Sequence, residues 1–170
     1  VEEGVVEVYD GAEIYAGFMS TIYQGGLLLG DGLVTSDIVN YGTVEPIISP
    51  QALRIDGDFE QLGEVPGLGS HSGVIYTQLG AVDHGELLIT GTSSIGGGLI
   101  VEIQDGYEPD EGEAFRILSC DWIDGQFDVA LMPGLSDGKY MKLTYGAPPL
   151  HGGLGGVDVE VDYFANLLGF

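Results

Sequence analysis

Glycine is the feature that most constrains the fold of this chain. The 170 residues include 30 Gly, which recur every few positions between short apolar stretches dominated by β-branched residues. Gly is unfavourable inside a helix and β-branched residues favour strands, so the pattern is not that of a helical protein. The sequence therefore predicts an all-β chain, with turns at Gly-rich segments such as residues 93–98 and 147–156.

The stretch "ALRIDGDFEQ", residues 52–61, is a clear strand signal because apolar and polar residues alternate along it. Its apolar face is predicted to carry Leu53, Ile55 and Phe59. Its polar face is predicted to carry Arg54, Asp56, Asp58 and Glu60. The acidic cluster is therefore expected to be the solvated side of a strand. Residues 99–104, 140–145 and 157–163 alternate in the same way, with Val101 on an apolar face.

The spacing of the strands indicates how they pair. In the N-terminal half they follow one another with too little sequence between them for helical crossovers, and the tight Asn-Gly or Asp-Gly pairs of a regular meander are missing. Parallel coils stacked as a β-solenoid satisfy both observations. A β-sandwich or jelly roll is the alternative, particularly in the C-terminal half. A single domain over residues 1–170 is expected for a chain of this size.

The charge balance restricts the partners. Only four Lys and Arg residues stand against 27 Asp and Glu, and the formal net charge is −23. This field repels phosphate backbones and anionic lipid surfaces, so nucleic acid and membrane surfaces are poor partners. No apolar run approaches the roughly 20 residues of a membrane span. Any self-assembly should respond to ions, because cations screen the repulsion between copies.

Catalytic chemistry has little support in the sequence. No motif singles out one pair of carboxylates for glycoside hydrolysis, and four cations are a thin supply for a polysaccharide lyase. His71, His84 and His151 lack the sequence context of a nucleophilic triad, and each is expected to be a solvated loop residue. Cys120, the only cysteine, is expected to be a small buried side chain. The chain is therefore predicted not to be an enzyme.

A calcium site is the one metal site that the residue pattern favours. The loop "DGYEPDEGE", residues 105–113, offers several oxygen ligands near turns, although it does not fit an EF-hand. The predicted ligands are Asp105, Glu108, Asp110 and Glu111. No pair of His or Cys residues has the spacing of a zinc site.

Both ends of the chain are candidate assembly segments, because residues 1–17 begin almost at once with strand-forming residues and residues 164–170 are largely apolar. The predicted contact residues are Val5, Val6 and Val8 at one end and Phe164, Leu167, Leu168 and Phe170 at the other. Two different complementary surfaces on one subunit make a head-to-tail contact, which propagates into an open filament. The alternative is that each segment packs on its own domain.

Several units of the chain, in order, resemble a known protein family. They are "GLVTSDIVNYGTVEP", "ALRIDGDFEQ", "GELLITGTSSIGGGLIVEI" and "GYEPDEGEAFRILS". Together they resemble the C-terminal section of bacterial secreted surface proteins with autotransporter-passenger-like β-solenoids. The resemblance covers roughly residues 30–163 and implies a right-handed parallel β-solenoid with a structural, adhesive or scaffold role outside the cell. It supplies no catalytic residues.

These observations predict a non-enzymatic extracellular protein, a surface or fibre subunit that associates with itself head to tail. The alternative is an adhesin or carbohydrate-binding β module that binds surface glycans and is stabilised by calcium. In either case the predicted location is the exterior of a bacterial cell.

Overall fold

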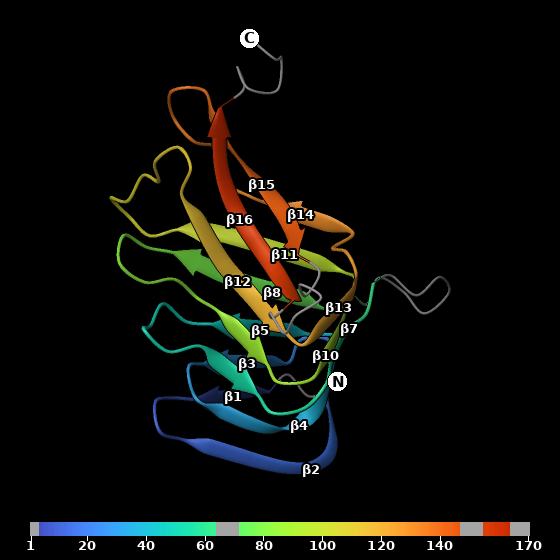
Figure 1. The fold of residues 1–170 in the computed structure, drawn as a ribbon. Helices are drawn as coiled ribbons and strands as arrows, with labels where there is room; N and C mark the ends of the chain where they lie inside the picture. Colours follow the sequence, from blue (N-terminus) through green and yellow to red (C-terminus); the bar gives the residue numbers. More distant parts are fainter. Residues whose placement is uncertain (1–3, 64–71, 147–154, 164–170) are drawn as a thin grey trace.

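The computed structural model describes residues 4–63, 72–146 and 155–163, and these segments contain sixteen strands and no helix (Figure 1). The prediction of an all-β chain is therefore confirmed. The strands form two sheets, one of six strands and one of ten. The chain passes between the two sheets from layer to layer, and the colours of Figure 1 follow this progression from the N-terminal strands to the C-terminal ones.

The first sheet is parallel throughout. In spatial order its strands are β1 (Val5–Val8), β3 (Leu27–Gly30), β5 (Thr43–Pro46), β8 (Val74–Leu79), β11 (Gly98–Ile103) and β14 (Val129–Leu131). Sequence order and spatial order agree within this sheet, so each strand pairs with the strand that precedes it in this sheet.

The second sheet is mixed. Its path contains β13 (Trp122–Gly125), β10 (Thr92–Ile95), β7 (Phe59–Gln61), β4 (Leu33–Asn40), β6 (Leu53–Ile55), β9 (Leu87–Ile89), β12 (Ala114–Cys120), β16 (Gly155–Tyr163) and β15 (Lys139–Gly146). Off this path, β2 (Glu13–Ile22) pairs with β4. The pairs β12–β16 and β15–β16 are antiparallel, and the others are parallel. The parallel pairing expected of a β-solenoid is therefore present in the first sheet and in part of the second, whereas the C-terminal strands, for which the sequence left a sandwich or jelly roll open, pair antiparallel.

The core lies between the sheets and follows the predicted alternation. Leu53 and Ile55 are fully buried and Phe59 is 1% exposed, while the intervening Asp56 and Asp58 are exposed. The predicted faces of residues 52–61 are therefore confirmed, although β6 and β7 are separate strands. Val101 in β11 and the three valines of β16 are buried as well.

One glycine shows how closely the layers approach. Gly30 ends β3 with φ +138°, and a Cβ atom at this position would lie 1.8 Å from the carbonyl oxygen of Val8. Any other residue would have to push β1 away from β3. Gly30 therefore allows β1 and β3 to approach more closely than any other residue would.

A buried pair of amide side chains joins successive layers at the corner where β4 and β7 end. Asn40 is fully buried and Gln61 is 2% exposed. The Asn40 Nδ2 donates to Gln61 Oε1 at 3.1 Å, and its Oδ1 accepts from the backbone N–H of Gly42 at 3.0 Å. The Gln61 Nε2 donates to the carbonyl oxygens of Gly96 at 2.8 Å and Gly98 at 3.0 Å. The two amides thus tie together three layers of the structure.

We predict that Gln61→Leu destabilises the protein by about 2–3 kcal/mol, because it removes one partner of the buried Asn40 amide and the donor to the part-buried carbonyls of Gly96 and Gly98. The matched control is Glu60→Leu, on the exposed side of the same strand, which should change the free energy of unfolding by less than about 0.5 kcal/mol. Urea denaturation measures both. Equal stability losses in the two variants would contradict a register held by the buried amides.

Candidate functional site

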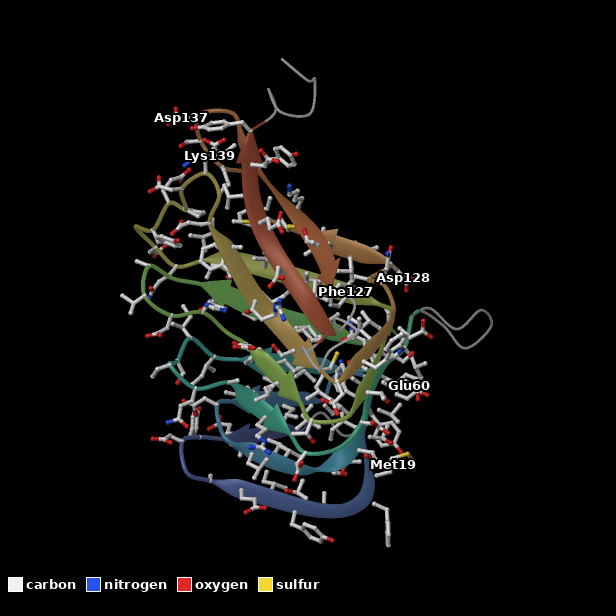
Figure 2. The ribbon with its side chains drawn as sticks, viewed as in Figure 1. Met19, Glu60, Phe127, Asp128, Asp137 and Lys139 are labelled. Atoms are coloured by element: carbon white, nitrogen blue, oxygen red, sulfur yellow. The ribbon has the colours of Figure 1, made fainter. Side chains whose placement is uncertain are left out.

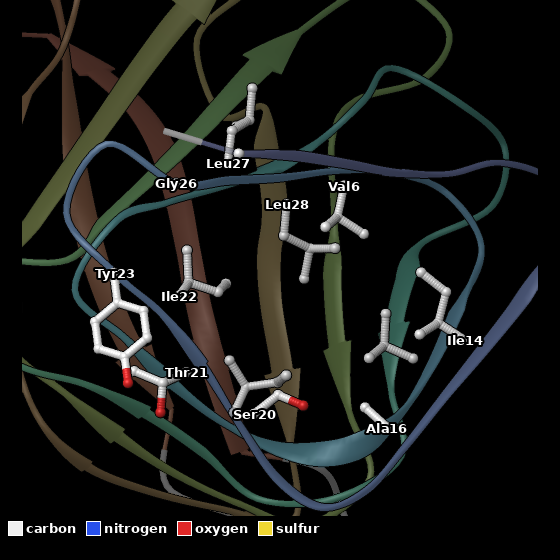
Figure 3. Close-up of a pocket in the computed structure, with 13 residues that line it drawn as sticks. Val6, Ile14, Ala16, Ser20, Thr21, Ile22, Tyr23, Gly26, Leu27 and Leu28 are labelled. Carbon is white, nitrogen blue, oxygen red and sulfur yellow. The ribbon is translucent and has the colours of Figure 1, made fainter. Parts of the chain in front are cut away.

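The N-terminal end of the core is open. A cavity of about 320 Å³ lies at this end between the strands β1 to β4. Figure 3 shows Val6, Ile14, Ile22 and Leu28 directed into this space, whereas Leu27 points away from it. The lining is therefore largely apolar, and it is the uncovered end of the same core that runs between the two sheets.

Two edge strands border this cavity. β1 is the terminal strand of the first sheet and pairs only with β3, while β2 pairs only with β4. Each strand therefore has one side without a neighbour among the described residues. An edge of this kind presents backbone N–H and C=O groups that another strand can pair with. Val6 points inward yet is 47% exposed, because no described layer lies beyond it.

Exposed apolar side chains are concentrated at the same end. Of the eleven large hydrophobic residues that are exposed in the described part of the chain, seven lie between residues 5 and 23. They are Val5, Val6, Tyr9, Tyr15, Phe18, Met19 and Tyr23. Exposed apolar residues concentrated in one part of a soluble protein mark interaction sites, so we define this end, with β1, β2 and the cavity, as the open end.

A bulge in β2 produces the most exposed of these side chains. Tyr15 pairs with Thr35 and Met19 pairs with Asp37, so β2 contains extra residues relative to β4. Gly17 adopts a φ of +85° in this bulge, and Phe18 beside it is 97% exposed. A phenylalanine held almost entirely in water is costly, and its burial against another surface would be favourable by about 1.5–3 kcal/mol.

The opposite end of the core is closed by the antiparallel strands. Leu143 and Tyr145 of β15 pack against the core together with Phe127 and Met132. The rings of Phe127 and Tyr145 lie 6.4 Å apart, and the Phe127 N–H donates to the Tyr145 hydroxyl at 3.2 Å. Figure 2 shows Phe127 beside the lower ends of β15 and β16. The two ends of the core therefore differ, one open and one covered.

The structure divides the residues predicted for self-association into three groups. Val5 is 61% exposed and belongs to the open end with Val6. Val8 is fully buried and belongs to the core. The C-terminal set, Phe164, Leu167, Leu168 and Phe170, lies outside the described residues.

Sequence reasoning missed the aromatic residues of the open end. The stretch "EIYAGFMSTIYQGG", residues 13–26, carries apolar side chains at both odd and even positions, so both faces of one strand would be apolar. That departure from alternation is a signal of a strand with apolar residues on its outer side as well. Tyr15 and Met19, which pair with polar residues of β4, are the clearest cases.

The loop predicted to bind calcium has partners of a different kind. Glu108 Oε1 accepts from the Ser136 hydroxyl at 2.9 Å and its backbone N–H at 3.1 Å, and lies 3.2 Å from the ammonium of Lys139. Figure 2 shows Lys139 near Asp137 at the end of the molecule where this loop lies. Lys139 is only 8% exposed, and its Nζ also donates to the carbonyl of Pro109 at 2.8 Å.

The four predicted ligands Asp105, Glu108, Asp110 and Glu111 are not gathered around one point. Within residues 4–63, 72–146 and 155–163, no group of three or more His, Cys, Asp or Glu side chains is placed to hold a metal ion. The Asp110 N–H instead donates to Glu113 Oε2 at 2.7 Å, which shapes the turn. The calcium site stays a prediction of the sequence.

The contacts of Glu108 give the protein a pH-dependent contribution to stability. The hydrogen bonds from Ser136 and the nearby Lys139 hold the pKa of Glu108 below its usual range. A carboxylate whose pKa is lowered on folding stabilises the protein above its unfolded pKa, near 4.3, and loses this effect as the pH falls through the folded value. We therefore expect Glu108→Gln to be less stable than the parent at pH 7, with the difference shrinking below about pH 4.

Urea midpoints at pH 7 and pH 3 test this expectation. Glu60→Gln, at an exposed strand position, serves as the control and should match the parent at both pH values. An unchanged Glu108→Gln midpoint at pH 7 would show that the Ser136 and Lys139 contacts contribute nothing.

The acidic cluster of residues 56–60 is exposed, as predicted, but two of its members also bind neighbouring strands. Asp58 Oδ1 accepts from the backbone N–H of Thr92 at 2.7 Å and from its hydroxyl at 3.0 Å. Asp56 Oδ1 accepts from the Thr90 hydroxyl at 2.7 Å. Figure 2 shows Glu60 directed away from the sheet. The cluster therefore links the layers of β7 and β10 at the protein surface.

We expect Asp58→Ala to cost about 1 kcal/mol of stability, because it removes the acceptor of the Thr92 N–H and hydroxyl. Asp58→Asn keeps one acceptor oxygen and should retain most of that stability. Thermal and urea unfolding of the two variants measures the difference. If Asp58→Ala and the parent unfold at the same urea concentration, the carboxylate is merely solvated.

The remaining polar candidates have structural partners. His84 is half-buried, and its Nε2 lies 2.9 Å from the carbonyl oxygen of Arg116. Its ring centroid lies 5.7 Å from that of Phe115 in a T-shaped arrangement. The prediction of a solvated loop residue is therefore wrong for His84, because this contact between layers was not visible in the sequence. His71 and His151 lie outside the described residues.

Cys120 is fully buried, as predicted, and burial is the main cause that raises the pKa of its thiol to about 11, with Asp121 adding to it. A thiol in this environment is protonated at neutral pH and is a poor nucleophile. Its place is in the core of β12.

Comparison with known proteins finds no family whose model matches the chain and no matching curated relative. The resemblance to autotransporter passengers therefore stays a prediction. No stretch of the described residues forms a helix that is long and apolar enough to span a bilayer.

Proposed function

We propose that this protein is an extracellular, non-enzymatic structural protein that associates with further copies of itself through the open end. The observation that carries the proposal is the pairing of an uncovered apolar cavity with two edge strands, β1 and β2, at the end where the exposed hydrophobic residues are concentrated. In this proposal the parallel layers are the coils of a right-handed β-solenoid, and the open end is where a further coil would lie.

Burial of the open end supplies the driving force. Each fully exposed Val, Phe or Met side chain gains about 1.5–3 kcal/mol on burial, while association costs about 4–15 kcal/mol of lost freedom and ordering. Phe18, Met19 and Tyr15 are 97%, 64% and 77% exposed, so their burial together contributes about 4–7 kcal/mol and offsets the lower part of that cost. Strand pairing along β1 would satisfy backbone groups that now face water.

The proposed contact is head to tail. β14 and β13 end the two sheets at the far side from β1 and β2. Since the ladders that lead to these edges are parallel, a copy displaced along the stack can continue both sheets without reversing strand direction. Contacts between unlike surfaces of this kind propagate into filaments. The bulge in β2 and the hairpin of β15 and β16 reduce the length of edge that can pair.

Charge opposes this association and makes it ion-dependent. Every copy carries a formal net charge of −23, so neighbouring copies repel one another. At 0.15 M salt the Debye length is about 8 Å, and the repulsion between surfaces outside the contact is largely screened. Assembly should therefore be stronger at physiological salt than in dilute buffer.

We predict that the double variant Tyr15→Ser and Phe18→Ser weakens self-association at least tenfold, because it removes the two most exposed aromatic side chains of the open end. Val82→Ser is the matched control, since Val82 is a 90% exposed hydrophobic residue away from both ends of the sheets. Sedimentation velocity over a range of salt and protein concentrations measures the effect.

Three outcomes of this experiment contradict the proposal in different ways. If the parent stays monomeric in every ionic condition, self-association is wrong and the glycan-binding alternative takes its place. If the double variant assembles as readily as Val82→Ser, the open end is not the contact. If Trp122→Ser, at the edge strand β13, leaves assembly unchanged, the contact is not head to tail.

A further inference from the structure

The cavity of the open end has room for apolar side chains that the described part of the chain does not supply. Its volume is about 320 Å³, and no charged residue lines it. A cavity of about 150 Å³ in an apolar core holds one benzene molecule. The open end therefore has room for about two side chains of the size of leucine or phenylalanine, and a carboxylate placed among them would be costly.

The free edge of β1 borders this cavity and is the more regular of the two edges. β1 pairs with β3 without interruption, from Val5 opposite Leu27 to Val8 opposite Gly30. β2, in contrast, contains the bulge at Gly17. An extended segment added to a sheet edge gains main-chain hydrogen bonds, and every second side chain of it points to the same face. A segment that pairs with β1 can therefore direct alternate side chains into the cavity.

One segment of this chain has the composition that such a place requires. Four segments lie outside the described residues, namely 1–3, 64–71, 147–154 and 164–170. The first two contain glutamate, and the third contains two prolines, which have no N–H to donate to a strand ladder. Residues 164–170, "FANLLGF", contain neither a charged residue nor a proline. In a chain of net charge −23, this segment can enter an uncharged cavity without bringing in a carboxylate.

The order of residues in this segment also suits an added strand. Phe164, Leu168 and Phe170 occupy alternate positions, so in a strand they share one face, together with one asparagine. Leu167 falls on the opposite face, between an alanine and a glycine. One face of the segment is therefore large and mostly apolar, which is what the cavity beside β1 can accept.

The segment cannot pair with the open end of its own copy. β16 ends at Tyr163, and the sheet path from β2 through β4, β6, β9 and β12 to β16 has five steps of about 4.8 Å, about 24 Å in all. Seven fully extended residues span at most about 25 Å, which leaves none for pairing. Figure 1 shows β16 ending on the side of the molecule away from β2. An open end can therefore receive residues 164–170 only from another copy.

We propose that residues 164–170 of one copy add as a strand to the free edge of β1 in the next copy, with the face of Phe164, Leu168 and Phe170 over the cavity. The inference rests on the proposed function, because it names the part of the second copy that the open end receives. The segment starts at the covered end of its own copy and enters the open end of the next, so the contact is head to tail. Each copy then donates one strand and accepts one.

The two neighbouring leucines of the segment provide the first test in the full chain. Leu168→Ser should weaken self-association at least tenfold in sedimentation velocity, because burial of one leucine side chain contributes a factor of that size or more. Leu167→Ser is the matched control, since it makes the same change on the outer face of the added strand and should leave association within about twofold of the parent. Urea unfolding shows whether each variant keeps the stability of the parent.

The cavity itself provides the second test. Ala16 lines the cavity, and Figure 3 shows it beside the space enclosed by the strands. Ala16→Phe should occupy the place of the donated side chains and weaken association at least tenfold, although it adds an apolar group to the open end. Ala81→Phe, at an exposed position away from the cavity, is the matched control and should associate like the parent.

Mixing the two defective variants tests the donation between copies. Leu168→Ser has an intact open end and a defective segment, whereas Ala16→Phe has an intact segment and a blocked open end. Each variant alone should be monomeric at concentrations where the parent assembles. An equimolar mixture should give a one-to-one complex that does not grow further, because only one productive contact is available.

The outcomes separate this inference from the proposed function. Equal association of the Leu167→Ser and Leu168→Ser variants, or a mixture that stays monomeric, overturns the donated strand. If Ala16→Phe and the Tyr15→Ser, Phe18→Ser double variant lose association while Leu168→Ser assembles like the parent, the open end is the contact and only the donated strand fails. If the parent is monomeric in every ionic condition, the proposed function fails and this inference fails with it.

Discussion

The fixed register between parallel layers is the constraint on which the rest of this structure depends. Strand side chains alternate, so a slip of one residue would replace the buried Leu53, Ile55 and Phe59 largely by charged side chains. Asn40 and Gln61 oppose such a slip, because the Asn40 amide donates to Gln61 and the Gln61 amide donates to the carbonyls of Gly96 and Gly98 in the next layer. On the outer side, Asp58 makes a second connection between layers through Thr92. Layers held in register can be stacked on one another, and the first and last layers leave strand edges and core residues that no further layer covers.

The core is covered at one end of the stack and uncovered at the other, and this difference determines where apolar side chains are exposed. At one end the chain reverses direction, and the antiparallel strands β15 and β16 bring Leu143 and Tyr145 over the core. At the other end β1 and β2 leave the core open, and the aromatic residues of β2 face water. The open end holds seven of the eleven exposed large hydrophobic residues in the described part of a chain that is strongly acidic.

The alternation of apolar and polar residues was enough to predict the all-β class and the faces of residues 52–61, because a strand buried on one face has an apolar residue at every second position. It could not predict the antiparallel hairpin, since Met141 and Val159 alternate with polar residues equally well in either strand direction. It also failed in β2, where the bulge at Gly17 shifts the phase of alternation and exposes Phe18. Long-range partners were invisible too. Glu108 was predicted as a calcium ligand, but Lys139, which binds it, is distant in sequence.

Hydrogen exchange of the backbone amides tests the open end most directly, because it reports strand pairing at each edge of the molecule. We expect amides in residues 13–22 of β2 to exchange more slowly at high protein concentration and physiological salt than in dilute, low-salt solution. Amides in residues 139–146 of β15, which already pair with β16, should exchange equally in both conditions. Unchanged exchange throughout β1 and β2, with protection gained only in β15, would contradict the open end as the place where copies meet.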